Sequence, residues 1–239
     1  MTGSWAKRGS QLQLQLYVNR RVEALNGAIR EKFPDLQGDL SWRAPLEDDG
    51  FREPRDGDFL APIGCEHLAK KLAAFWPRGG PVWDGLAVFE RPEGRDGVLL
   101  VEAKSHPAEV YGDGSAATDE ASVKQIREAL EATQLRLGLA PDADRWIRPL
   151  RPEVAGHSSV YQSANRYAHL YWLRDRGIDT WLVHVLFCDD PTYRGTTCQE
   201  WKEALPRIEA DLGLSGVAVP YADHLFLPGL SPDDVGHIG

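Results

Sequence analysis

The segment VLLVEAKSHP, residues 98–107, consists of four aliphatic residues followed by an acid, a small residue and a base. Burying a carboxylate and an ammonium group beside such a run costs several kcal/mol unless each charge finds a partner. Glu102 and Lys104, at the end of an otherwise apolar strand, therefore indicate a site in which both charges have partners.

The flanking sequence predicts that this segment is the second strand of a β-hairpin. Residues 81–90 (PVWDGLAVFE) and 97–105 (GVLLVEAKS) have the composition of strands, and RPEGRDG between them is typical of a turn. Paired residues then have numbers that sum to about 188, which places Asp84 across from Lys104 and diagonal to Glu102. Because side chains alternate along a strand, all three charges are expected on one face.

These three charges suit hydrolysis of a phosphodiester. Two converging carboxylates, Asp84 and Glu102, are oxygen ligands for a hard cation, and Mg²⁺ usually takes one or two carboxylates, waters and substrate phosphate oxygens. Lys104 lies beside Glu102 on the same face. It is placed to orient or help deprotonate an attacking water and to offset charge in a phosphorane-like transition state.

The hairpin resembles that of the PD-(D/E)XK nuclease superfamily, which carries an Asp on its first strand and (Asp/Glu)-x-Lys on its second. The matching residues are Asp84 in VWDG and Glu102 and Lys104 in VEAK; Trp83 stands where the family has Pro. The resemblance implies a restriction-endonuclease-like α/β fold with a mixed sheet, dependence on Mg²⁺ or Mn²⁺, and cleavage of nucleic acid, usually DNA. It covers the hairpin directly and, through the order of helices and strands, residues 64–190.

Two other interpretations of the hairpin stay open. A short acid-x-Lys pattern is common by chance, so the charges also fit a buried ion pair in an ordinary sheet. A catalytically inactive nuclease fold that serves as a binding or interaction module is the alternative function. RNA is an alternative substrate to DNA.

A polar stripe marks the helix expected over residues 158–176. Gln162, Asn165, Arg166 and His169 stand at i, i+3, i+4 and i+7 of that helix. Amide and guanidinium groups suit phosphate oxygens and a metal-bound water, so Asn165 and Arg166 are candidates for substrate binding. The resemblance implies a catalytic role for Gln162, because several superfamily members place a Gln on the helix after this strand. A solvated helix face is the alternative.

Other candidates have an ordinary structural role as an alternative. The resemblance implies that Glu66 is a metal ligand, yet an acid in the first turn of a helix over residues 65–76 also suits the helix dipole. His106 is placed either to touch a phosphate or to pack at the strand end that Pro107 marks. RDGDF, residues 55–59, is typical of a turn, and an acidic ligand loop is the alternative.

The charge of the chain restricts how it can bind nucleic acid. Its 239 residues include 27 Lys and Arg against 36 Asp and Glu, a net charge of −9. The molecule thus has no global basic field, and nucleic acid must be bound in a local basic groove. The resemblance implies that the helices before and after the hairpin lie near the active end of the sheet. The candidates for phosphate contacts are then Lys70, Lys71, Arg78, Lys124, Arg127 and Arg166, and a solvated charge is the alternative for each.

Cysteine spacing and hydropathy predict a cytoplasmic protein. Cys65, Cys188 and Cys198 have no metal-ligand spacing, and an odd number suggests reduced thiols rather than zinc or disulfides. No apolar stretch approaches the roughly 18–20 residues that span a bilayer, and no signal-peptide core begins the chain. We therefore expect no membrane partner; the oligomeric state stays open, with a dimer as one alternative.

Hydrophobic periodicity and turn residues predict one α/β domain with a mixed sheet flanked by helices. Residues 1–63 are an N-terminal helix and loop extension, residues 64–190 the core, and residues 191–239 a C-terminal helix and tail. Besides the hairpin, the expected helices cover residues 11–32, 65–76, 119–137, 158–176 and 199–212, and the expected strands cover residues 40–43 and 180–190.

Overall fold

A mixed five-stranded β-sheet lies at the centre of the computed structural model, which describes residues 4–36, 38–91, 94, 96–150 and 158–235. The strands follow one another in the order β1-β2-β3-β4-β5 across the sheet. β1 to β3 are antiparallel neighbours, whereas β3, β4 and β5 run parallel. The strands are β1 Ser41–Ala44, β2 Gly85–Glu90, β3 Asp96–Lys104, β4 Asp179–Cys188 and β5 Ala222–Pro228. The expected α/β class and mixed sheet are confirmed.

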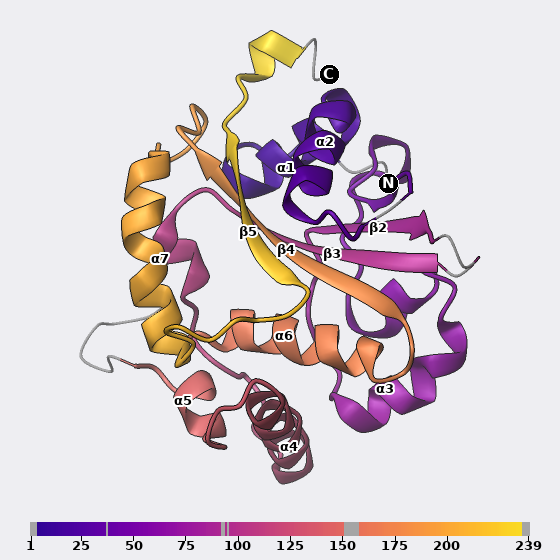
Figure 1. Ribbon diagram of the computed structural model, residues 1–239, viewed down its shortest axis with the longest axis vertical. Coiled ribbons are helices and arrows are strands. Elements are labelled where there is room, and N and C mark those ends of the chain that lie inside the picture. The colour runs from indigo at the N-terminus through magenta and orange to yellow at the C-terminus, as the bar shows by residue number, and fades with distance from the viewer. Residues whose placement is uncertain (1–3, 37, 92–93, 95, 151–157, 236–239) are drawn as a thin grey trace.

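Helices cover both faces of this sheet (Figure 1). α1 and α2 lie on one side, whereas α3, α4 and α6 lie on the other. The α-helices are α1 Gly9–Arg20, α2 Val22–Lys32, α3 Ala69–Phe75, α4 Glu120–Arg136, α5 Ala143–Ile147, α6 Tyr161–Arg174 and α7 Cys198–Leu212. Short 3-10 helices are η1 Glu47–Asp49, η2 Asp56–Leu60, η3 Glu66–Leu68, η4 Pro107–Val110 and η5 Pro232–Val235.

β3 is apolar almost throughout because its side chains, which point alternately to the two faces of the sheet, are buried on both faces. Leu99 and Val101 pack toward α1 and α2, whereas Val98 and Leu100 pack toward the helices on the opposite side. A strand that is covered on both faces has no solvent side on which polar residues are favoured. Glu102 continues the second series, so its side chain is directed to the face that α6 covers.

The single helix expected over residues 11–32 is wrong, because the chain forms two helices there. Arg21, with φ −135° and ψ 35°, leaves the helical region between α1 and α2. The change of direction allows Leu14 of α1 and Leu25 and Ile29 of α2 to reach one hydrophobic cluster on the same sheet face. Tertiary packing therefore overrides an uninterrupted helical periodicity.

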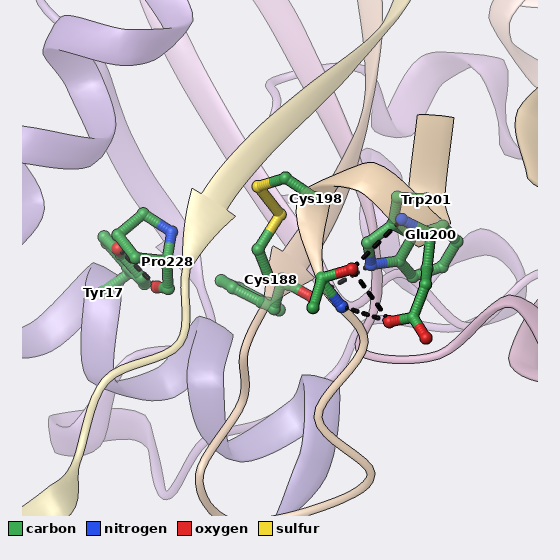
Figure 2. Close-up of a disulfide and its surroundings, with 8 residues drawn as sticks. Tyr17, Cys188, Cys198, Glu200, Trp201 and Pro228 are labelled. Carbon is green, nitrogen blue, oxygen red and sulfur yellow. Dashed lines mark hydrogen bonds between the residues drawn. A yellow bond between two sulfur atoms is a disulfide. The ribbon is translucent and has the colours of Figure 1, made fainter. Parts of the chain in front are cut away.

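Besides the short 3-10 helices, two described elements were not expected from the sequence. β5 lies at the sheet edge, and only Leu225 and Leu227 of its residues ADHLFLP are buried, so no continuous apolar run marks this strand. The hydroxyl of Tyr17 in α1 donates to the carbonyl of Pro228 at 2.8 Å, which fastens the end of β5 (Figure 2). α5 spans five residues after the N-cap Asp142, too few to show a hydrophobic period.

The prediction of three reduced thiols is wrong for two of them. Cys188, the last residue of β4, forms a disulfide with Cys198, the first residue of α7 (Figure 2). The loop between β4 and α7 folds back, so the two Cα atoms lie 5.1 Å apart although the residues are separated by 10 positions. Cys65 is free and buried. The cytoplasmic location therefore loses its argument from thiols and stays a prediction.

In the described part of the chain, no helix combines the length and the apolar character needed to cross a bilayer.

Candidate active site

The hairpin places its acids closer together than the sequence predicted. Gly85 pairs with Val101 and Glu90 with Asp96, so paired residues sum to 186 rather than 188. Continued by one residue, this register sets Asp84 opposite Glu102, and the expected pairing of Asp84 with Lys104 is wrong. Because the sum changes by an even number, the shared face of the charges is retained.

Asp84 is fixed by the backbone of the neighbouring strand. Its Oδ2 atom accepts a hydrogen bond of 2.8 Å from the backbone N–H of Ala103. The residue lies just before β2 and is only partly buried. Its carboxylate thus stands at the open end of the hairpin, next to Glu102.

Glu102 lies between two cations. The Nζ atom of Lys104 is 2.5 Å from Glu102 Oε1, and the Nε atom of Arg166 is 2.6 Å from Oε2. Both Glu102 and Arg166 are 2% exposed. Truncating one partner of such a buried pair typically costs about 3–5 kcal/mol, because the remaining charge is left buried and unpaired.

Arg166 uses all of its guanidinium nitrogens in hydrogen bonds, and two of these bonds join α6 to the hairpin and the segment before it. Besides the bond to Glu102, Nη1 donates to Asn165 Oδ1 at 2.6 Å and Nη2 donates to the Val82 carbonyl at 2.7 Å. The guanidinium carbon lies 5.0 Å from the ring centroid of Trp83. The fork geometry of arginine permits this fixed arrangement.

The two acids differ in protonation because their surroundings differ. Burial raises the pKa of Glu102, but Arg166 and Lys104 outweigh it and bring this pKa to about 2. Burial and then the charge of Glu102 raise the pKa of Asp84 to about 7. Burial lowers the pKa of Lys104, but Glu102 and Asp84 outweigh burial, so the net shift is upward. Lys104 is therefore an ammonium ion at neutral pH.

An open cavity of about 570 Å³ lies in front of Asp84. Gln162, Asn165 and Arg166 of α6 line it, so part of the predicted polar stripe meets the hairpin. This stripe does not face solvent: Asn165, Arg166 and His169 are all buried, and Gln162 is partly exposed. The cavity volume falls within the usual range for binding sites, roughly 300–1,000 Å³. We call it the Asp84 cavity.

Glu102 and Lys104 do not line this cavity; they line a separate small space of about 20 Å³. Two further predicted residues, Glu66 and His106, are also not among those that line the Asp84 cavity. Glu66 is exposed on η3, a 3-10 helix before α3 rather than the first turn of a regular α-helix. His106 is the N-cap of η4, where its Nδ1 atom accepts from the backbone N–H of Ala108 at 3.1 Å. These placements favour the structural alternatives for both residues.

The basic candidates are dispersed. Lys70 and Lys71 are exposed on α3, while Lys124 and Arg127 pair with acids within reach of α4. Arg78 lines a second cavity, described below. Of the six candidates, Arg166 lines the Asp84 cavity, and its charge is already paired with Glu102.

The acids of RDGDF serve the local chain. Oδ1 of Asp56 accepts from the backbone N–H groups of Gly79 and Gly80 at 2.6 Å each, and Asp58 pairs with Arg52. Asp56 thus anchors the loop before the hairpin, in agreement with a structural role.

Sequence reasoning missed two residues near the charged cluster. Arg55 lines the Asp84 cavity from a loop, and nothing in the local pattern distinguishes it from a solvated charge. His184 is the β4 neighbour of Glu102 in the sheet register and is buried; burial lowers its pKa to about 3. A histidine within TWLVHVLFC was the available signal, because that strand is otherwise almost entirely apolar.

The donor set of the site fits a hydrated divalent cation better than a fully protein-ligated one. Within the described ranges, no group of three or more His, Cys, Asp or Glu residues is arranged to hold a metal. Mg²⁺, however, retains several waters and needs only one or two carboxylates. Asp84 faces the cavity and is destabilised as an anion by Glu102, a repulsion that a cation relieves.

Comparison of the chain with protein-family models, curated proteins and solved structures found no match. A function for this protein is therefore argued from the chemistry of the charged cluster and its cavity.

Proposed function

We propose that this protein is a divalent-metal-dependent nuclease with a restriction-endonuclease-like core, which hydrolyses phosphodiester bonds of nucleic acid, most readily DNA. The observation that carries the proposal is the convergence of Asp84, Glu102 and Lys104 at one end of a buried hairpin, where Asp84 lines an open cavity. An ordinary structural ion pair needs only one acid and one base. This cluster also contains Arg166, so two acids face two bases. Burial and the charge of Glu102 still raise the pKa of Asp84, and a cation shared between the carboxylates would relieve that cost.

The proposed roles follow from the geometry. Asp84 and Glu102 hold Mg²⁺ or Mn²⁺, which supplies Lewis-acid stabilisation of phosphate oxygens and activation of a bound water. Lys104 keeps its proton at neutral pH, so its ammonium group orients the water and offsets negative charge in the transition state rather than acting as the base. Gln162, at the cavity wall, is placed to bind the attacking water or a phosphate oxygen.

Arg166 has a positioning role in this proposal. Its bonds to Glu102 and to the Val82 carbonyl fix the acid relative to the segment that precedes Asp84. Asn165 in turn accepts from Arg166 and lines the cavity. These contacts hold the two metal ligands in place before substrate arrives, as efficient catalysis requires.

A specific observation favours the alternative of an inactive binding module. Both carboxylate oxygens of Glu102 already have cationic partners, Lys104 and Arg166, so the acid needs no metal for its own stabilisation. The net charge of −9 also opposes broad contact with nucleic acid. The two functions differ in one measurable property, which is metal-dependent cleavage.

Cleavage of linear, circular and single-stranded DNA and of RNA, with Mg²⁺ and with Mn²⁺, tests the proposal. We expect wild type to cleave at least one DNA substrate and Asp84→Asn to lose about 100-fold or more of that activity. The side-chain amide of this variant keeps an oxygen that can accept from the backbone N–H of Ala103, so the hairpin is retained.

Glu66→Gln is the matched control, because Glu66 is an exposed acid that lies outside the Asp84 cavity. It should cleave as wild type does. Equal activity of wild type and Asp84→Asn, or no cleavage under any of these conditions, contradicts the nuclease proposal.

A further inference from the structure

A second cavity, of about 450 Å³, adjoins the Asp84 cavity. Gly80 and Pro81, in the loop before the hairpin, line both of them. Residues of η2 and α3 form other parts of its lining, and His169 reaches it from α6. We call it the His169 cavity. A nucleic-acid strand whose phosphate lies at Asp84 thus has a second binding cavity beside it. The loop that contains Gly80 and Pro81 separates this cavity from the proposed cleavage site.

His169, which lines this cavity, has an unused hydrogen-bond acceptor. The side chain is 1% exposed, and its Nδ1 atom lies 2.8 Å from the backbone carbonyl of Asn165. A carbonyl can only accept, which assigns the proton to Nδ1 and leaves a lone pair on Nε2. Among the described residues, Nε2 has no hydrogen-bond partner. Burial lowers the pKa of His169 to about 3, so the ring is neutral at physiological pH.

The remaining lining combines an apolar floor with further acceptors. Leu72 and the ring of Trp76 are apolar surfaces, and the Trp76 ring centroid lies 4.9 Å from that of His169. Asp56 and Asp58 add carboxylate oxygens on the η2 side. Arg78 adds a guanidinium group, which suits a phosphate or sugar oxygen. Apart from Arg78 and the indole N–H of Trp76, the polar side chains around the apolar floor are acceptors.

This chemistry calls for a flat, largely apolar ligand that carries several N–H donors. An unstacked nucleobase has both properties, because proteins recognise such bases by aromatic contact and by hydrogen bonds to the Watson–Crick edge. Adenine, cytosine and guanine each carry an exocyclic amino group, whereas thymine presents one ring N–H between two carbonyls. Those carbonyls would face the aspartate oxygens and the Nε2 lone pair.

We propose that the His169 cavity binds one unstacked base of the nucleic-acid strand and selects bases that carry an exocyclic amino group. The proposal rests on the nuclease function above and adds a base preference next to the site of cleavage. Guanine, with an amino group and an adjacent ring N–H, matches the acceptors best.

Binding of fluorescently labelled d(A)10, d(C)10 and d(T)10 in EDTA tests this preference without cleavage. By fluorescence anisotropy we expect wild type to bind d(A)10 and d(C)10 about tenfold more tightly than d(T)10, the effect of one or two net hydrogen bonds. His169→Phe keeps the aromatic shape but removes Nε2. It should lower the affinity for d(A)10 and d(C)10 to that for d(T)10 and leave d(T)10 binding unchanged.

A second variant guards against misfolding of His169→Phe. Asp58→Asn changes an exposed carboxylate and should reduce the preference severalfold, whereas the control Glu66→Gln should keep it. Equal binding of all three oligonucleotides by wild type, binding of none, or an unchanged preference in both cavity variants overturns the proposal.

A parallel cleavage assay of wild type on the same oligonucleotides with Mn²⁺ separates the two claims. Cleavage without base preference means that only the cavity proposal fails. A base preference without cleavage means that the nuclease proposal fails, while the cavity still binds bases.

Discussion

At the scale of single residues, the central feature is that two neighbouring acids, Asp84 and Glu102, have different electrostatic surroundings. Glu102 has two cations within hydrogen-bond distance, so it stays ionised although it is buried. Burial and the repulsion of Glu102 raise the pKa of Asp84 to about 7, although the backbone N–H of Ala103 donates to its carboxylate. The pair thus stores unfavourable electrostatic energy at neutral pH, as functional sites often do.

This asymmetry predicts a pH-dependent effect of Asp84→Asn on stability. The pKa of Asp84 is about 7 in the folded protein and 3.8 as its ordinary value, so between these pH values the folded state binds more protons than the unfolded state. Wild type therefore loses stability, relative to the variant, as pH rises through this window. From pH 5 to pH 8 the free energy of unfolding of Asp84→Asn should gain about 2 kcal/mol on that of wild type.

Urea unfolding of both proteins at pH 5 and pH 8, without divalent metal, measures the difference. If the free energies of unfolding of wild type and Asp84→Asn differ by the same amount at pH 5 and at pH 8, then Asp84 is not destabilised as an anion in the folded protein.

The charged residues could be selected from the sequence, but their partners could not. Glu102 and Lys104 stood out because charges are costly beside an apolar strand, and Asp84 followed from hairpin pairing. The pairing of Arg166 with Glu102 depends on how α6 packs on the sheet, which no local pattern encodes. His106 caps a 3-10 helix and Glu66 lies in one. Histidine and glutamate fill such structural roles as readily as catalytic roles, so the sequence could not distinguish the two.

At the scale of elements, strands covered on both sides were the most predictable. β3 and β4 have nearly continuous apolar sequences, and helices α4 and α7 have clear N-caps in Asp119 and Thr197. The break at Arg21 and the edge strand β5 were missed because tertiary contacts determine both. The polar stripe of α6 is visible in the sequence, but its inward direction depends on the contact of Arg166 with the buried Glu102, which no local pattern encodes.

The disulfide between β4 and α7 gives a prediction at this scale. It joins residues separated by 10 positions, and closing a loop of that size stabilises a fold by about 2–3 kcal/mol in the chain-entropy description. The double variant Cys188→Ala/Cys198→Ala should lose about this free energy of unfolding and keep any nuclease activity, because neither cysteine lines the Asp84 cavity.

Urea unfolding with and without dithiothreitol measures this loss. Reductant should bring wild type to the stability of the variant and leave the variant unchanged. Identical stability of wild type and variant without reductant would contradict a stabilising role for the bridge.

At the scale of the whole molecule, a net charge of −9 limits the electrostatic part of nucleic-acid binding. The guanidinium groups that line the two cavities are those of Arg55, Arg78 and Arg166, and Arg166 is paired with Glu102. About two phosphates are therefore neutralised, which for a single strand corresponds to a slope of log K against log salt of about −1.4.

Fluorescence anisotropy titrations of a labelled single-stranded DNA at about 50 to 200 mM KCl measure this slope. A value steeper than about −4 would mean that an extended basic surface contributes, contrary to this assignment.

Binding of Mn²⁺, followed by electron paramagnetic resonance of the free ion, tests most directly whether Asp84 and Glu102 share a hard cation. Wild type and Glu66→Gln should bind Mn²⁺ with equal affinity, and Asp84→Asn should bind it at least about tenfold more weakly. Absence of Mn²⁺ binding by wild type, or equal binding by wild type and Asp84→Asn, would contradict the shared cation.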